Sequence, residues 1–233
     1  MNKNNGSFNI AFFGSSLLSA YWNGAATYYR GLIRALAELG HKVTFYEPDA
    51  FNRSGHRDID PPDWAEVVVY PAQREALDKA LEEAQSADII VKASGVGVFD
   101  PELESAVLQM HAPDKKIIFW DVDAPATLNR TTNDHNDYFR ELIPQYDAVL
   151  TYGGGPPVVK AYKALGAQDC IPVYNALDST THFPAEKDHR FSADLTFLGN
   201  RMPDRERRVW EFFFKPAGLR PEEEFLLGGS GWV

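Results

Sequence analysis

Short apolar runs alternate with segments of helical periodicity along almost the whole chain. Runs typical of buried strands occupy residues 9–15, 42–46, 66–70, 88–92, 116–120, 148–152 and 171–174. Between several of them, apolar residues at helical spacing, proline in a first turn or glycine after a last turn indicate helices at 24–39, 73–85, 101–110, 138–143 and 156–165. A strand, a helix and a further strand form a right-handed unit with parallel strands. The pattern therefore predicts an α/β fold, with a Rossmann-like, doubly wound parallel sheet over residues 1–178.

The pattern breaks once and then restarts. Residues 179–192 are polar and lack periodicity, which is typical of a linker. A strand at 194–198, a helix at 204–214 and a strand from 225 follow, which is one βαβ unit. So short a segment cannot cover both faces of a parallel sheet. We expect residues 193–233 to be the truncated start of a second lobe, or else a tail that packs on the first domain.

Composition is that of a globular protein, with 44% hydrophobic and 24% charged residues. The formal net charge of -10 disfavours non-specific binding of nucleic acid, which depends on clustered lysine and arginine. The single cysteine, Cys170, begins an apolar run, so we expect a buried thiol and no disulfide within the chain. No leader and no apolar run of about 18 residues is present, so the sequence predicts a cytoplasmic protein without a membrane span. Its oligomeric state stays open.

Ligands of open α/β sheets bind beyond the carboxyl ends of the strands, near the point where strand order reverses. Small and polar residues follow the predicted strands, and the candidate substrate-binding residues among them are Gly14, Ser15, Ser94, Gly95, Gly153, Gly154 and Asn175. Any one of these segments also fits an ordinary turn. The dinucleotide fingerprint G-x-G-x-x-G is absent, because Gly14 is followed by Ser-Ser-Leu, and this disfavours NAD or FAD.

Asp121 and Asp123 stand two residues apart after the strand at 116–120, and three interpretations of them are open. Residues at this spacing in an extended segment share a face and could hold a divalent cation. Alternatively, repulsion between the carboxylates raises the pKa of one, which then serves as a catalytic base for an acceptor hydroxyl. The pair could also simply stabilise a turn. The six histidines show no ligand spacing, so we predict no metal site and favour catalytic roles for both aspartates over metal binding.

Several segments together resemble a known family. Residues 22–47 (WNGAATYYRGLIRALAELGHKVTFYE) resemble the first helix and second strand of GT-B glycosyltransferases. Residues 171–184 (IPVYNALDSTTHFP) resemble the crossing between the two lobes of that fold, and residues 194–201 (DLTFLGNR) resemble the opening strand of its second lobe. With WDVDAPAT and LTYGGGPPVV, the chain is similar to the CgeB-type, spore-maturation-protein-like glycosyltransferases over essentially its whole length.

The resemblance implies an enzyme of two Rossmann-like lobes, in which the first binds an acceptor and the second a nucleotide-sugar donor. Transfer then needs no metal and no cofactor besides the nucleotide-sugar as co-substrate. Gly14, Ser15, Asn23 and Gly24 would form the first-lobe loop, and Arg201 and Arg205 would meet the donor diphosphate.

The acidic residues that hold the donor's ribose and sugar in such enzymes are not in this chain, so we expect residues 1–233 to be inactive alone. Two other functions stay open. One is a non-catalytic binding or structural protein, that is, a degenerate transferase. The other is a Rossmann-type sugar-nucleotide or NAD(P)-dependent enzyme.

Overall fold

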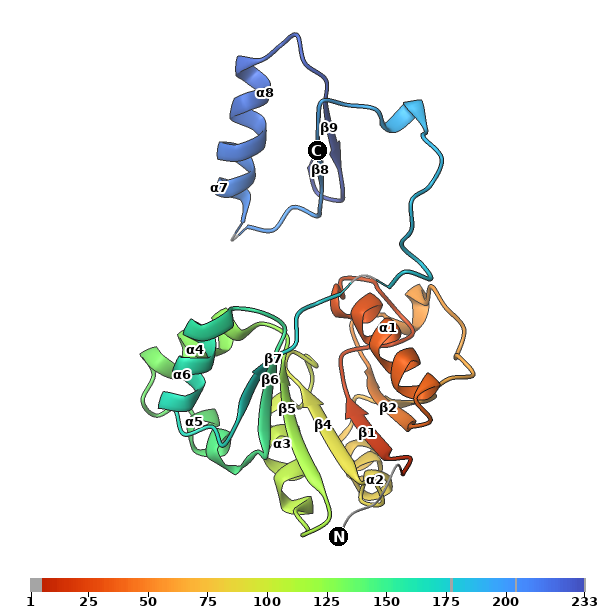
Figure 1. Cartoon of the computed structure of the whole chain (residues 1–233), viewed down its shortest axis with the longest axis vertical. Coiled ribbons are helices and arrows are strands. Elements are labelled where there is room, and N and C mark those ends of the chain that lie inside the picture. Colours follow the sequence, from red (N-terminus) through yellow and green to blue (C-terminus); the bar gives the residue numbers. More distant parts are fainter. Residues whose placement is uncertain (1–5, 177, 204, 233) are drawn as a thin grey trace. The chain divides into compact units, whose positions relative to one another are not determined.

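A computed structural model describes residues 6–176, 178–203 and 205–232 of the chain (Figure 1). The chain divides into two compact units, Met1–His182 and Phe183–Val233. Each unit is described by itself. The predicted linker at 179–192 spans the boundary between them, and the functional assignment of the units stays a prediction.

The first unit is built on seven parallel strands in the order β3-β2-β1-β4-β5-β6-β7. Their bounds are β1 Asn9–Phe13, β2 Lys42–Asp49, β3 Glu66–Pro71, β4 Ile89–Ala93, β5 Lys116–Asp121, β6 Ala148–Thr151 and β7 Cys170–Pro172. Each of the seven overlaps a run that the apolar pattern marks as a strand, with ends that differ by up to three residues. The predicted Rossmann-like parallel sheet is therefore confirmed.

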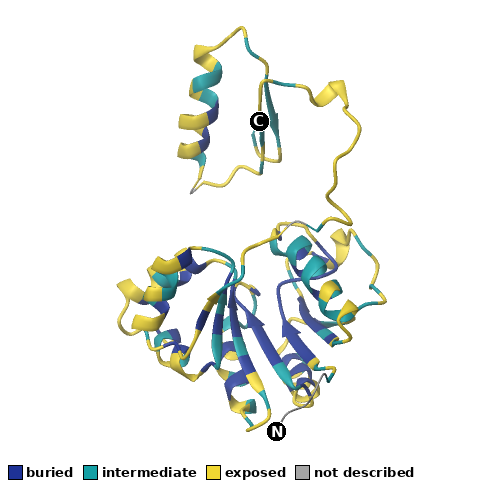
Figure 2. Ribbon diagram, in the orientation of Figure 1, coloured by how far each residue is buried: buried dark blue, intermediate teal, exposed yellow. Residues whose placement is uncertain are grey.

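Helices cover both faces of this sheet, as predicted. α1 (Ala25–Glu38) packs through Tyr29 and Ile33 on the face that carries Phe12 and Trp120. The opposite face, which carries Phe119, packs against the remaining helices. These are α2 Arg74–Ala84, α3 Asp100–Ala106, α4 Ala124–Asn133, α5 Phe139–Leu142 and α6 Gly155–Ala164. Single 3₁₀ turns lie at Ser54–His56, Val107–Met110, Ile143–Gln145 and His189–Phe191. Figure 2 shows the strands between these layers as largely buried.

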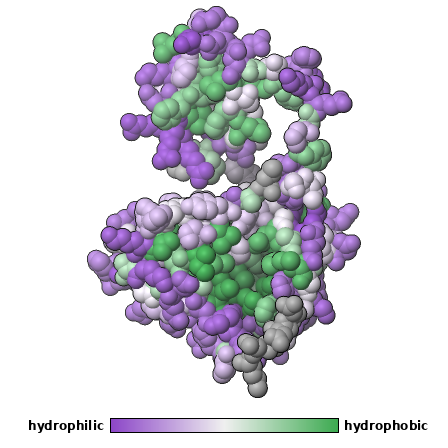
Figure 3. All heavy atoms as spheres, in the orientation of Figure 1, coloured by the Kyte–Doolittle hydropathy of each residue, from purple (hydrophilic) through white to green (hydrophobic). Residues whose placement is uncertain are grey.

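The two faces are covered unequally. On the strands β5, β6 and β7, the face that α1 shares is less covered: Ile118 and Leu150 are only partly buried, and Ile171 is 44% exposed. In Figure 3, hydrophobic residues accordingly reach the surface over the middle of the first unit.

Helix α4 is an element that the apolar pattern does not predict. Its buried positions are Ala124, Thr127 and Thr131, so its inner side lacks the large apolar residues that mark a helix in sequence. Pro125 in its first turn is the one local signal.

The second unit holds the predicted βαβ pattern. β8 (Leu195–Leu198) and β9 (Phe225–Gly228) pair in parallel. A continuous helical stretch connects them, namely α7 Glu206–Val209, a π-helical turn Trp210–Phe214 and α8 Lys215–Leu219. Its core is aromatic, since Phe197 packs against Phe213 and Trp232 with ring centroids 6.0 and 5.9 Å away.

Candidate functional site

The carboxyl edge of the large sheet contains the reversal point at which Rossmann-like folds bind ligands. β1 and β4 are neighbours in the sheet, yet the chain leaves β1 toward α1 on one face and β4 toward α3 on the other. Ser15 follows β1 and Ser94 follows β4, so both flank the reversal point. Of the other candidates in the first unit, Gly14, Asn23 and Gly24 follow β1 and Gly95 follows β4, and the rest lie at the ends of β5, β6 and β7.

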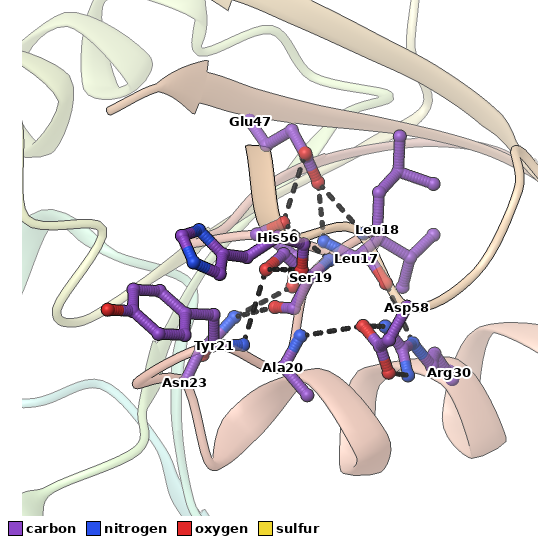
Figure 4. A network of polar contacts seen from close by, with 11 residues as sticks. Leu17, Leu18, Ser19, Ala20, Tyr21, Asn23, Arg30, Glu47, His56 and Asp58 are labelled. Carbon is purple, nitrogen blue, oxygen red and sulfur yellow. Dashed lines mark hydrogen bonds and ion pairs between the residues drawn. The ribbon is translucent and has the colours of Figure 1, made fainter. Parts of the chain in front are cut away.

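The loop after β1 is held by a buried carboxylate (Figure 4). Glu47, at the end region of β2 and 4% exposed, accepts hydrogen bonds from Ser16 Oγ at 3.0 Å and from the amides of Leu17 at 2.5 Å and Leu18 at 3.3 Å. Burial raises the pKa of Glu47, and these hydrogen bonds oppose the rise. These contacts hold the conformation of the loop after β1.

Ser15 and Asn23 serve the same loop. Ser15 Oγ donates to Asn23 Oδ1 at 2.9 Å, and Asn23 Nδ2 donates to the carbonyls of Ser16 and Ser19 at 3.0 and 3.1 Å. Both side chains are more than nine-tenths buried. Their substrate-binding role stays a prediction, since their polar atoms already bond within the loop.

Arg30 ties the loop to the segment after β2. Its guanidinium donates to the carbonyl of Leu17 at 2.7 Å and to both carboxylate oxygens of Asp58 at 2.8 Å. This pairing holds the pKa of Asp58 down at about 2. Figure 4 shows how Arg30, Asp58 and Glu47 enclose the loop.

The two glycines of this loop meet different surroundings. A Cβ on Gly14 would lie 2.4 Å from Cζ of Phe45, so the close approach of that ring requires glycine. Gly24 precedes α1, and a Cβ there would meet nothing within 4 Å. Packing against Phe45 therefore requires glycine at position 14, whereas no neighbouring atom restricts the residue at position 24, before α1.

Asp121 is an internal anchor. It is 0% exposed and accepts hydrogen bonds from Ser94 Oγ at 2.9 Å, from the amide of Asp123 at 3.0 Å, from Thr127 Oγ1 at 3.1 Å and from the Tyr162 hydroxyl. Burial raises its pKa, so the expected direction is right but the expected cause, repulsion by Asp123, is not. Such contacts are what we expect of an aspartate that stabilises a turn, which is the third interpretation of the pair.

Asp123 differs from its neighbour. It is exposed and stands at the N-cap of α4, where its side chain makes no capping hydrogen bond. Of the two aspartates, it is therefore the one that a molecule at this edge could reach. Its catalytic role remains a prediction.

The remaining strand-end candidates belong to ordinary local structure. Ser94 Oγ donates to Asp121 and accepts the amide hydrogen of Val122 at 2.8 Å. Gly95 and Gly154 have φ of +67° and +87°, which favours glycine. Gly153 is half-buried and Asn175 is exposed.

A buried ion cluster, which the sequence analysis missed, holds the loop after β4. Lys92 is 0% exposed and its ammonium contacts the carboxylates of Asp100 and Glu104, the latter at 3.2 Å. Asp100 in turn accepts the amide hydrogens of Val96 at 3.2 Å and Gly97 at 2.7 Å. A lysine within an apolar run, followed by acidic residues one helical turn apart, was the available signal.

Among the residues that the structure describes, four other than glycine have positive φ, and all four lie in loops at the carboxyl edge of the large sheet. They are Trp22 at 48°, Phe51 at 57°, Asn52 at 56° and Phe99 at 58°. Bulky residues rarely adopt this conformation, and such strain concentrates at functional sites. The sequence analysis singled out none of the four, because backbone strain has no signature in composition.

In the second unit, Arg201 lies after β8 and contacts the segment after β9, whereas Arg205 lies at the start of α7. Arg201 pairs with Glu206 at 2.8 Å, and its amide donates to the carbonyl of Ser230 at 2.9 Å. Their role toward a diphosphate stays a prediction.

Two classes of site find no support in the part of the chain that the structure describes. Over residues 6–176, 178–203 and 205–232, no three His, Cys, Asp or Glu side chains gather where they could hold a metal ion. Within the same ranges, no helix is both long enough and apolar enough to cross a membrane.

Comparison with known proteins identifies the fold. No family model matches the chain, and no curated protein matches it. Among solved structures, the chain is similar to UGT89C1 of Arabidopsis thaliana, solved in complex with UDP-L-rhamnose, with a TM-score of 0.56 and 9% sequence identity. The match covers 96% of this chain and 65% of that one, so the chain spans less than two thirds of its length. At this identity the likeness shows the fold alone, which is the Rossmann-like α/β fold of a GT-B glycosyltransferase.

Proposed function

We propose that the protein containing this chain is a glycosyltransferase that moves a sugar from a nucleotide-sugar to an acceptor held by the first unit. One observation carries the proposal. A GT-B glycosyltransferase matches 96% of the chain, which comprises a seven-stranded sheet and a separate βαβ unit. The resemblance of residues 22–47, 171–184 and 194–201 to GT-B glycosyltransferases points the same way.

The carboxyl edge of the first unit supplies a base for this reaction. The carboxylate of Asp123 takes the proton of an acceptor hydroxyl, whose oxygen attacks the anomeric carbon of the donor. The bond from that carbon to the diphosphate oxygen breaks, and the nucleoside diphosphate leaves. Asp121 positions the base by accepting the amide hydrogen of Asp123 at 3.0 Å.

In this proposal, arginines of the second unit stabilise the leaving group. Arg201 carries positive charge after the end of β8, and Arg205 carries it at the start of α7; such charge stabilises a departing diphosphate. No metal is invoked in this scheme.

The test is release of nucleoside diphosphate from a panel of UDP-, GDP- and dTDP-sugars by the complete protein that includes this chain. We expect Asp123→Asn to lower turnover ~100-fold, as removal of a general base does. Asp114→Asn is the matched control, since Asp114 is also exposed but lies in the turn before β5, at the opposite edge of the sheet. Residues 1–233 alone should be inactive.

Other outcomes would assign other functions. Binding of NAD(P) with no turnover of any nucleotide-sugar would favour a Rossmann-type oxidoreductase. Binding of a nucleotide-sugar with no turnover in the complete protein would favour the non-catalytic interpretation. Equal turnover by the Asp123→Asn and Asp114→Asn variants would remove Asp123 from the chemistry.

A further inference from the structure

Phe51 crosses the carboxyl end of β1 at the reversal point of the sheet. It belongs to the loop after β2, yet its ring reaches the loop after β4, where a Cβ on Gly97 would lie 2.8 Å from Phe51 Cε2. β1 stands between β2 and β4 in the sheet, so the ring spans the end of β1. This is where α/β folds of this kind bind ligands.

The backbone holds this ring outward at a cost. Phe51 and Asn52 both have φ near +57°, a conformation that disfavours a bulky side chain, and Phe51 nevertheless stays 58% exposed. Burial of the ring therefore does not explain the strain. A fixed, exposed aromatic face suits stacking against a flat ring of a ligand.

A buried cation lies against the same ring. The guanidinium carbon of Arg53 is 5.1 Å from the Phe51 ring centroid, and Arg53 is 9% exposed. Its Nη1 donates to the carbonyl of Ser15 at 2.8 Å, whereas its buried Nε has no hydrogen-bond partner. The charge of Glu47 acts on Arg53, but the Glu47 carboxylate accepts hydrogen bonds from the loop after β1 and makes no ion pair with Arg53 among the described residues. A buried guanidinium without an ion pair is unfavourable unless an anion completes it.

We propose that Phe51 and Arg53 form a subsite for an acceptor that carries an anionic group next to a ring, aromatic or sugar, with a face that can stack. The ring of the acceptor stacks on the exposed face of Phe51, and its carboxylate or phosphate pairs with Arg53. This rests on the proposed function only in calling the ligand an acceptor. The binding chemistry follows from the two side chains.

The test uses phenyl phosphate, glucose 6-phosphate, inorganic phosphate and benzyl alcohol as probes, with dissociation constants from ligand-observed NMR. One of the two ring phosphates should bind more tightly than inorganic phosphate or benzyl alcohol, and which one does so identifies the ring as aromatic or sugar. Phe51→Gly should weaken that probe up to ~10-fold, the range of an aromatic contact. Arg53→Gln should weaken it and inorganic phosphate ~10-fold or more but leave benzyl alcohol unchanged.

The chain offers a matched control pair. Arg190 lies 5.5 Å from the ring centroid of Phe191, which is 65% exposed, and the pair belongs to the second unit. Phe191→Gly and Arg190→Gln should leave all four constants unchanged. Folding is separated from binding because Phe51→Gly relieves a positive φ, so its melting temperature should not fall below that of the wild type. Arg53→Lys, which keeps the charge, should retain part of the phosphate affinity.

The proposal is overturned if neither ring phosphate binds better than inorganic phosphate, or if the Phe51 and Arg53 variants bind like their controls. Failure here and failure of the proposed function are distinct. Sugar transfer by the complete protein with no effect of these variants on binding would refute the subsite alone. Binding as expected without turnover of any nucleotide-sugar would refute the transferase alone.

Discussion

Replacing Asp121 tests whether this aspartate is an anchor or a base. Asp121→Ala removes the acceptor of four hydrogen bonds inside the first unit. The Ser94 and Thr127 hydroxyls can rotate toward other acceptors, but the amide of Asp123 and the hydroxyl of Tyr162 would lose their partner. Each buried donor left unpaired costs about 1–3 kcal/mol, and removing a buried charge returns part of that. We expect a net loss of ~3 kcal/mol in the free energy of unfolding.

The size of the loss should depend on the replacement. Asp121→Asn keeps one acceptor oxygen and the shape of the side chain, and the Tyr162 hydroxyl can accept from the new amide. Its loss should be ~1 kcal/mol. Asp123→Asn, at an exposed position without a side-chain cap, should stay within ~0.5 kcal/mol of the wild type.

The assay is urea denaturation followed by far-ultraviolet circular dichroism, with the midpoint and slope measured for all three variants. A loss below 1 kcal/mol for Asp121→Ala would refute the reasoning from the four hydrogen bonds. If Asp121→Asn instead abolished turnover of the complete protein at unchanged stability, the catalytic interpretation of Asp121 would replace that of an anchor.

Three further predictions concern stability. Gly14→Ala should cost ~2 kcal/mol by denaturant titration, because its Cβ would lie 2.4 Å from Phe45, whereas Gly24→Ala should change stability by less than ~0.5 kcal/mol; equal effects would contradict the packing argument. Lys92→Met should cost ~3–5 kcal/mol in the same titration, because it leaves the buried Glu104 carboxylate and the partly exposed Asp100 carboxylate without their cation, and a neutral result would show that water reaches them. Asp58→Asn should cost ~1 kcal/mol at pH 7, after allowance for an ion pair that is partly exposed. The pKa of Asp58 is about 2 when folded and 3.8 as the reference value, so this stabilisation is fully present above pH 4 and should shrink as the pH falls from 4 through 2; a difference as large at pH 2 as at pH 7 would contradict the assignment.

Local pattern was enough to predict the parallel sheet. Strands buried on both faces are near-continuous apolar runs, and β1, β4 and β5 are such runs in this chain. The positions of Ser15 and Ser94 directly after strands also predict that both lie at the carboxyl edge of the sheet, where the structure has them, and their binding role stays a prediction. The pattern did not predict helix α4, because the residues on its inner side are small or polar.

The role of a single side chain depends on contacts between segments far apart in the chain. The sequence alone does not predict such contacts. Asp121 and Asp123 are alike in sequence, but Tyr162 and Ser94 close over one and leave the other exposed. Phe51 becomes notable only because its ring meets Gly97, 46 positions away along the printed sequence. Hydrophobic periodicity is a local property and determines secondary structure and layer order. Burial, pKa and strain arise from atoms that only the tertiary structure brings together, so it alone separated the anchor from the candidate base and brought Phe51 and Arg53 to the end of β1.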